Sequence, residues 1–253
     1  MARIRVTQDG PYEVEGAIPI RQQIIEPNEQ GESWEWRAGT AFDRPGEVVE
    51  LCRCGGSSNK PFCDGTHRTN GFDGTEVADR RPYVEQAVVY RGPLVALTDA
   101  EMLCAFARFC DARGQVWDLV EVDDPEAEAL TEREAALCPS GRLIAWRPGP
   151  TGRPEPQDPE LEPSIGIVED PAMGVSGPLW VRGGIPVIAA DGTPYEVRNR
   201  MTLCRCGESR NKPFCDGTHA SIDFTDGLPL GEEPDRNAQV RRSRAPVPRR
   251  PAE

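Results

Sequence analysis

Three cysteines and one histidine recur at identical spacing at two places in the chain. The donors are Cys52, Cys54, Cys63 and His67 in residues 52–67, and Cys204, Cys206, Cys215 and His219 in residues 204–219. His67 and His219 are the only two histidines of the 253 residues. Thiolate and imidazole side chains are the ligands of zinc, copper and iron–sulfur clusters. The repeat therefore predicts two metal centres of the same kind.

The spacing within each copy separates two kinds of centre. A structural zinc site usually takes two thiolates from a C-x(2–4)-C segment. Here a single residue separates the first two cysteines, and the last cysteine and the histidine form a Cys-x3-His turn. Two tight pairs suit a two-iron cluster with one pair on each iron. A lone zinc ion held by all four donors is the alternative.

Small and polar residues between the donors fit the same interpretation. Gly55 and Gly207 follow the C-x-C pair, where a glycine lets the backbone approach a ligand closely. Ser57 and Ser209, with nearby backbone N–H groups, are expected to donate hydrogen bonds to cluster sulfur. The Asp64-Gly65 dipeptide predicts a turn that brings the third cysteine and the histidine to one side.

Both copies fit the pattern C-x-C-x2-[S/T]-x3-P-x-C-D-G-[S/A/T]-H. The chain resembles the CDGSH iron–sulfur family, also called NEET proteins, over residues 1–75 and 175–228. The resemblance implies one [2Fe–2S] cluster per motif, held by its three cysteines and its histidine. It also implies small β-rich domains. Because many members are homodimers with one motif per chain, we expect a monomer here with an internal pseudo-twofold arrangement.

A histidine ligand raises the reduction potential of a cluster relative to cysteine. The second ring nitrogen remains able to hold a proton where it faces solvent. Reduction adds negative charge and favours that proton. Proton-coupled redox is therefore expected at both sites.

The repeat extends beyond the motifs. Residues 10–20 align with residues 177–187, so the repeated unit is a domain rather than a short motif. We predict CDGSH-type domains at residues 1–80 and 175–230. The first lead-in is longer, and its extra residues predict a hairpin around residues 26–36.

Residues 84–147 differ in character from the two repeats. Apolar residues 84–97 predict a strand, and Thr98 with Glu101 forms a capping-box signature for a helix that ends near Ala112. Residues 125–137 predict a second, acidic helix, and residues 143–146 a closing strand. The expected fold class is thus α+β, with a β-α-α-β module inserted between two β-rich cluster domains.

This module also resembles a divergent single-cluster ferredoxin domain. Cys104, Cys110 and Cys138 follow the C-x5-C and C-P spacing of three-cysteine ferredoxins. In the predicted helix, however, residues six apart lie about 120° apart around the axis, so Cys104 and Cys110 would not converge. We therefore expect buried thiols and no third cluster.

Prolines mark the remaining segments. Residues 148–174 predict a Pro-rich linker. Residues 231–253 are rich in arginine and proline and predict a flexible tail.

The totals restrict the function. A net charge of −13 disfavours a nucleic-acid partner. The sequence has neither an apolar run of about 20 residues nor a signal-peptide core, so no membrane span is expected and the cytoplasm is the expected location. With both histidines used as ligands, an enzyme is not expected. The chain would carry electrons or donate clusters, with a redox protein or an apo iron–sulfur acceptor as partner. A redox or iron sensor, a scaffold, and a subunit that feeds a catalytic partner are the alternatives.

Overall fold

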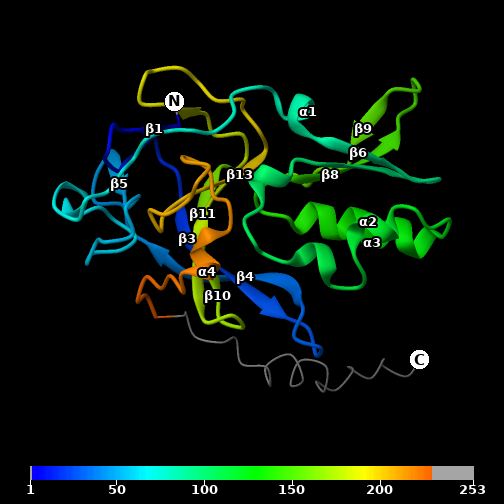
Figure 1. Cartoon of the computed structure of the whole chain (residues 1–253), viewed down its shortest axis with the longest axis horizontal. Coiled ribbons are helices and arrows are strands. Elements are labelled where there is room, and N and C mark those ends of the chain that lie inside the picture. The colour runs from blue at the N-terminus through cyan, green and yellow to red at the C-terminus, as the bar shows by residue number, and fades with distance from the viewer. Residues whose placement is uncertain (1, 230–253) are drawn as a thin grey trace, which may run out of the picture.

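The computed structural model describes residues 2–229, so the predicted tail at 231–253 lies outside the described part (Figure 1). The fold is α+β, with mostly sheets and few helices, as expected. The strands are β1 (Arg3–Val6), β2 (Tyr12–Glu15), β3 (Ile20–Pro27), β4 (Ser33–Phe42), β5 (Val48–Leu51), β6 (Val88–Arg91), β7 (Ala96–Asp99), β8 (Leu143–Pro148), β9 (Pro154–Pro156), β10 (Ser164–Asp170), β11 (Val175–Arg182), β12 (Val187–Ile188) and β13 (Arg200–Leu203). The α-helices are α1 (Tyr83–Gln86), α2 (Val116–Leu119), α3 (Pro125–Leu137) and α4 (Thr218–Ser221).

Two sheets carry the repeated motifs, and each contains strands from both copies. The first has the order β12-β1-β2-β5 and the second β13-β11-β10-β3-β4. In the first sheet β12, from the second copy, pairs in parallel with β1. In the second sheet β3, from the first copy, pairs in parallel with β10. The two copies therefore fold as one interlocked unit.

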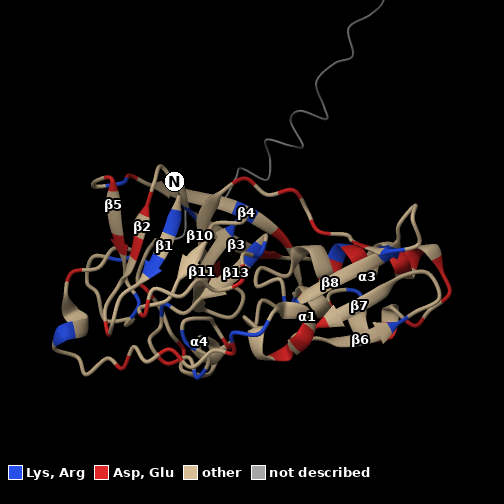
Figure 2. Cartoon of the chain, turned by 90° about the horizontal axis from the view of Figure 1, so that it is seen from above, with Lys and Arg blue, Asp and Glu red and all other residues tan. Residues whose placement is uncertain are grey.

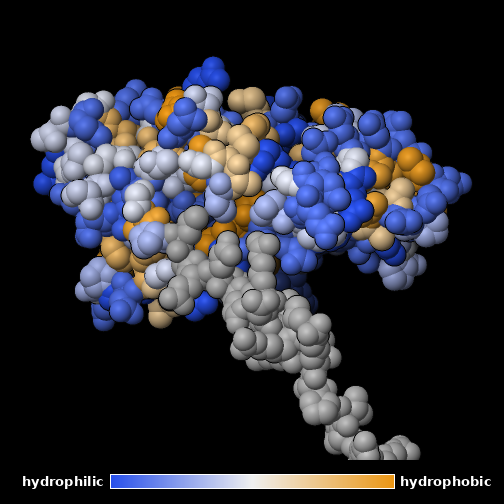
Figure 3. All heavy atoms as spheres, turned by 90° about the horizontal axis from the view of Figure 1, so that it is seen from below, coloured by the Kyte–Doolittle hydropathy of each residue, from blue (hydrophilic) through white to orange (hydrophobic). Residues whose placement is uncertain are grey.

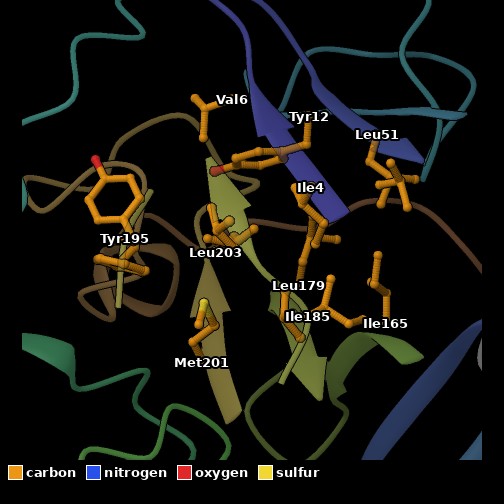
Figure 4. Packing of buried hydrophobic residues seen from close by; sticks show 14 of the residues in the cluster. Ile4, Val6, Tyr12, Leu51, Ile165, Leu179, Ile185, Tyr195, Met201 and Leu203 are labelled. Carbon is orange, nitrogen blue, oxygen red and sulfur yellow. The ribbon is translucent and has the colours of Figure 1, made fainter. Parts of the chain in front are cut away.

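A single apolar core joins these two sheets. β1 alternates exposed and buried residues, so that Ile4 and Val6 face inward from the first copy. Figure 4 shows side chains of both copies in contact in this core, including Tyr12, Leu179 and Leu203. Complete burial of a large apolar side chain contributes about 1.5–3 kcal/mol. Much of the stability thus depends on contacts between the copies.

The longer lead-in of the first copy forms the predicted hairpin. β3 and β4 pair antiparallel, with Glu26 opposite Glu35. The prediction of a linker over residues 148–174 is wrong for two segments. β9 extends the third sheet at its edge, where proline is tolerated. β10 is a largely buried strand between β11 and β3. The apolar run Ile165-Gly-Ile-Val168 follows several prolines, and those prolines led to the prediction of a linker.

The middle module packs beside the two motif sheets (Figure 1). Its sheet has the order β6-β7-β8-β9, and α2 and α3 lie between β7 and β8 in the chain. The acidic helix at 125–137 and the strand that begins at Leu143 are confirmed. Asp124 caps α3 by accepting a hydrogen bond from the Glu126 N–H at 2.7 Å. The single strand over residues 84–97 is wrong, because α1, β6 and β7 divide it.

The helix predicted from Thr98 to Ala112 is absent. Thr98 belongs to β7, and its hydroxyl is bonded to Tyr83 and to the indole N–H of Trp146, so it caps no helix. The chain instead forms two short 3-10 turns, Glu101–Leu103 and Phe109–Asp111. Between them Phe106 and Arg108 have positive φ angles of 54° and 62°, which no right-handed helix allows.

Arg200 fastens the module to the second copy. Its side chain is 1% exposed, lies 2.7 Å from Asp158 and donates to the carbonyls of Ala135, Ala136, Cys138 and Leu143. Three of these carbonyls lie at the C-terminal end of α3, where a cation is favourable. The module is therefore held against the strand that leads into the second motif.

The outer surface is largely polar. Figure 2 shows acidic residues on β2, β5 and α3, in keeping with the negative net charge. On the face drawn in Figure 3, apolar areas are small and separated by hydrophilic residues. Among residues 2–229, the helices are all too short or too polar to cross a membrane.

Candidate metal centres

Each motif is a loop that folds back onto the strand before it. In the first copy Cys52 N donates to Pro61 O at 2.9 Å, and Cys63 N donates to Glu50 O at 2.9 Å. The second copy repeats both bonds, at 2.8 and 2.9 Å, from Cys204 N to Pro213 O and from Cys215 N to Thr202 O. These bonds bring the C-x-C pair and the third cysteine to the same end of the strand.

The eight donor atoms form four close pairs. The sulfurs of Cys52 and Cys54 lie 4.0 Å apart, and those of Cys204 and Cys206 3.7 Å. In each copy the third cysteine sulfur lies 3.4 Å from the histidine Nδ1, in the pairs Cys63–His67 and Cys215–His219.

These separations can be compared with those around a metal. With metal–sulfur bonds of about 2.3 Å and metal–nitrogen bonds of about 2.0 Å, two ligands of one tetrahedral metal lie roughly 3.5–3.8 Å apart. All four pairs are close to this separation. Each pair is therefore spaced as two ligands of one metal would be.

Each histidine is positioned by a turn, and this turn is the same in both copies. Asp64 Oδ1 accepts from Thr66 N and Asp216 Oδ1 from Thr218 N, both at 3.0 Å. The glycine after each aspartate has φ near +85°, which glycine adopts without strain. The following 3-10 turn Thr66–Arg68 and helix α4 then present the histidine toward the third cysteine.

The expectation is wrong for the hydroxyls of Ser57 and Ser209. Their hydroxyls donate to the carbonyls of Phe62 and Phe214 at 2.6 and 2.7 Å, which closes the loop internally. Backbone groups contact the cysteine sulfurs instead. Gly56 N lies 3.4 Å from the Cys54 sulfur, and Gly65 N lies 3.4 Å from the Cys63 sulfur. Such donors to sulfur tune a cluster's potential.

The two thiols of each C-x-C pair share a hydrogen bond. The bond from Cys52 lowers the pKa of Cys54, and the bond from Cys206 lowers the pKa of Cys204. Burial raises the pKa of Cys63 and lowers the pKa of His219 to about 4, so that this imidazole is neutral and its nitrogen is free to bind metal.

The two motifs touch through their first ligand pairs. Cys54 and Cys206 form an antiparallel bridge. A Cβ on Gly55 would lie 2.4 Å from the Cys206 carbonyl oxygen, and one on Gly207 2.7 Å from that of Cys54. Only glycine allows this approach, which explains why it occupies both positions.

The two sites differ in exposure. Cys204, Cys206, Cys215 and His219 are all buried. In the first copy only Cys52 is buried, whereas Cys54, Cys63 and His67 are partly exposed. Open surface hollows lie beside Cys63 and beside His67, and Glu50 lines both hollows.

The three remaining cysteines converge, contrary to the helix-based expectation. Cys104, Cys110 and Cys138 line one largely apolar pocket. Because the chain is non-helical from residue 104 to residue 108, the angular argument against convergence does not apply. The residue spacing and the Cys-Pro dipeptide were the available signal.

This pocket adjoins the second motif. A Cβ on Gly217 would lie 3.1 Å from the Cβ of Phe106 and 3.4 Å from the Cys104 carbonyl oxygen. Asn211 Nδ2 donates to Met102 O at 2.8 Å. The second motif therefore lies between the first motif and the three cysteines.

The nine cysteines make no disulfide. Comparison with known families agrees with the arrangement of the donors. The family described as iron-binding zinc finger, CDGSH type, matches residues 9–68 and 176–220. The family described as a divergent 4Fe–4S mono-cluster matches residues 90–148. Searches of curated proteins and of solved structures returned no match. Both family matches support iron–sulfur cluster binding, and the chain is a tandem CDGSH protein with a divergent ferredoxin-type module inserted between its two motifs.

Proposed function

We propose that each motif holds one [2Fe–2S] cluster through its three cysteines and its histidine, and that the protein transfers single electrons. The observation that carries the proposal is the pairing of donors, which recurs in both copies at 3.4–4.0 Å. When bound, such clusters supply one-electron redox chemistry. Histidine ligation favours a higher potential than four cysteines would give.

The residues around each motif would bind the cluster and orient its ligands, and they would not take part in a reaction themselves. The backbone N–H groups of Gly56 and Gly65 stabilise negative charge on the ligand sulfurs of the first site. The reciprocal exchange of β3 and β12 supports a pseudo-twofold relation between the two domains. We propose that the chain acts as a monomer in which this internal pair replaces a homodimer.

The partner is proposed to be a redox protein or an apo iron–sulfur acceptor, with neither nucleic acid nor membrane involved. Substrate turnover is not part of the proposal, because both histidines stand in ligand positions. A reducing compartment such as the cytoplasm suits nine unpaired cysteines. Proton coupling at the histidines stays a prediction.

The test is an anaerobic count of iron and inorganic sulfide on the purified full chain, with its visible spectrum. The expected result is a coloured protein that loses one [2Fe–2S] unit in C63A and one in C215A. Stoichiometric zinc without sulfide would overturn the proposal and favour structural zinc sites.

A third cluster is a second candidate, favoured by the convergence of Cys104, Cys110 and Cys138 on one pocket. The positive φ angles of Phe106 and Arg108 indicate local strain of the kind retained at functional sites. Two [2Fe–2S] clusters account for four irons per chain. A third cluster would add three or four more irons, according to its type. C138S would then remove only the additional iron.

Two mixing experiments distinguish electron transfer, which we propose, from cluster donation and from sensing. Holoprotein mixed with apo-ferredoxin would lose its own spectrum if it donates clusters. Mixed with a reduced flavoprotein, it would be bleached and recover on reoxidation if it carries electrons. A sensor or scaffold would do neither rapidly.

A further inference from the structure

We infer that the two motif sites are electronically unequal: the first is the exchange site of higher potential, and the second is a buried site whose potential is lowered by two carboxylates on Arg205. The inference rests on the proposed function. It concerns the arginine between the first two cysteines, which is Arg53 in one copy and Arg205 in the other.

The two arginines have opposite surroundings. Arg205 has a side chain 3% exposed, forms ion pairs with Glu169 at 2.8 Å and with Asp226, and donates to the Gly177 and Val168 carbonyls. Ser176 holds the acids in place by donating to Glu169 at 2.6 Å and accepting from Asp226 N at 3.0 Å.

Arg53 is equally buried, at 2% exposure, but its hydrogen bonds go to the carbonyls of Thr7 and Gly74. Its guanidinium lies 5.5 Å from the ring centres of Tyr12 and Phe72. Within the described residues 2–229, it forms no ion pair with a carboxylate.

The difference in charge follows directly. Burial would raise the pKa of Asp226, but the charge and hydrogen bond of Arg205 lower it, so this acid is ionised. Burial raises the pKa of Glu169 to about 7. The charge of Arg205 is therefore offset by acids, whereas within the described residues no carboxylate offsets that of Arg53.

A buried positive charge stabilises the added electron, and solvent exposure does the same. Both effects favour the first site, whose Cys54, Cys63 and His67 reach the surface. The bridge between Cys54 and Cys206 joins the two sites directly. If both sites hold clusters, an electron taken from a reduced donor protein would come to rest at the first site, which has the higher potential. It would leave from there to a one-electron acceptor protein.

The test is an anaerobic redox titration of the full chain, followed by electron paramagnetic resonance. Two midpoints are expected, and H67C and H219C assign them, because cysteine in place of histidine lowers the potential of its own site. E169Q/D226N should raise only the lower midpoint. E208Q makes a charge change at an exposed residue beside Cys206 and should shift it much less.

If E169Q/D226N does not fold, a measurement on the unaltered protein still tests whether the two sites differ in exposure. A hydrophilic iron chelator should bleach the first site faster than the second, as assigned by H67C. Equal midpoints, a lower midpoint at the first site, or an unmoved midpoint in folded E169Q/D226N would overturn the inference. A correct iron and sulfide count would meanwhile leave the proposed function standing.

Discussion

The hydroxyl of Tyr12 donates a hydrogen bond of 2.8 Å to the main-chain carbonyl of Cys204, across 192 positions of the sequence. The same hydroxyl lies 3.0 Å from the carbonyl of Pro213. Tyr12 is fully buried in the joint core, as Figure 4 shows. A strand of the first copy thus holds the metal-binding loop of the second.

Replacing Tyr12 by phenylalanine should remove the hydrogen bonds to the Cys204 and Pro213 carbonyls and keep the packing of the ring. Leaving two buried carbonyls without the hydroxyl costs about 1–3 kcal/mol of unfolding free energy. Y12F should also shorten the lifetime of the second site's spectrum relative to the first. Urea unfolding and timed absorbance measure both effects. Y90F, at a partly exposed tyrosine, is the control, and equal behaviour of the two variants would contradict the role of Tyr12.

Gly55 and Gly207 should be intolerant of alanine. Each has positive φ, and an added Cβ would lie 2.4 or 2.7 Å from a backbone oxygen of the other motif. The matched control is G31A, where φ is +87° but nothing lies within 4 Å. G31A should cost about 1–2 kcal/mol for the backbone alone. G55A should cost roughly 1–3 kcal/mol more, because the motifs must separate. Equal losses in thermal unfolding would show that the approach is unimportant.

Arg200→Met should loosen the middle module. The change removes the Arg200 donor from Asp158 and from four backbone carbonyls, and breaking a buried pair costs about 3–5 kcal/mol. Hydrogen exchange of α3 should accelerate. R147M removes exposed ion pairs to Glu128 and Glu132 and should cost under about 1 kcal/mol. Protection of α3 that is the same in R200M and R147M would refute the anchoring role.

Glu134 should make stability depend on pH. It is 1% exposed, burial raises its pKa to about 7, and its Oε2 has no partner. The unfolded chain releases this proton near pH 4.5, and the folded chain only near pH 7. The contribution of Glu134 to stability therefore falls between these values, by at most about 3 kcal/mol. E134Q should flatten this decline in urea midpoints from pH 5 to 8, whereas E126Q, at an exposed site, should not.

Local signals predicted local structure well. The close pairing of the cysteine and histidine side chains followed from the spacing within sixteen residues, and α3 followed from Asp124, Pro125 and an acidic first turn. The capping-box signature at Thr98 failed because Tyr83 and Trp146, distant in sequence, claim its hydroxyl. Tertiary contacts therefore decided what the local pattern could not.

The strand exchange lay beyond any local pattern. β3 meets β10 with Ile20 beside Ile165, a pairing of residues far apart in the sequence. The prolines before residue 164 favoured a linker, although the strand that follows is buried. The unequal exposure of the two motifs likewise arises from what packs on them, because their sequences are nearly identical.

The exchange of β3 and β12 between the two copies has a consequence for how such a protein could evolve. A chain with one motif could complete its sheet only by meeting a second chain, so its assembly would depend on dilution. Joining both copies covalently replaces that encounter with a high effective concentration. It also frees the copies from symmetry, so that a substitution beside one cluster need not be repeated beside the other, and each could specialise.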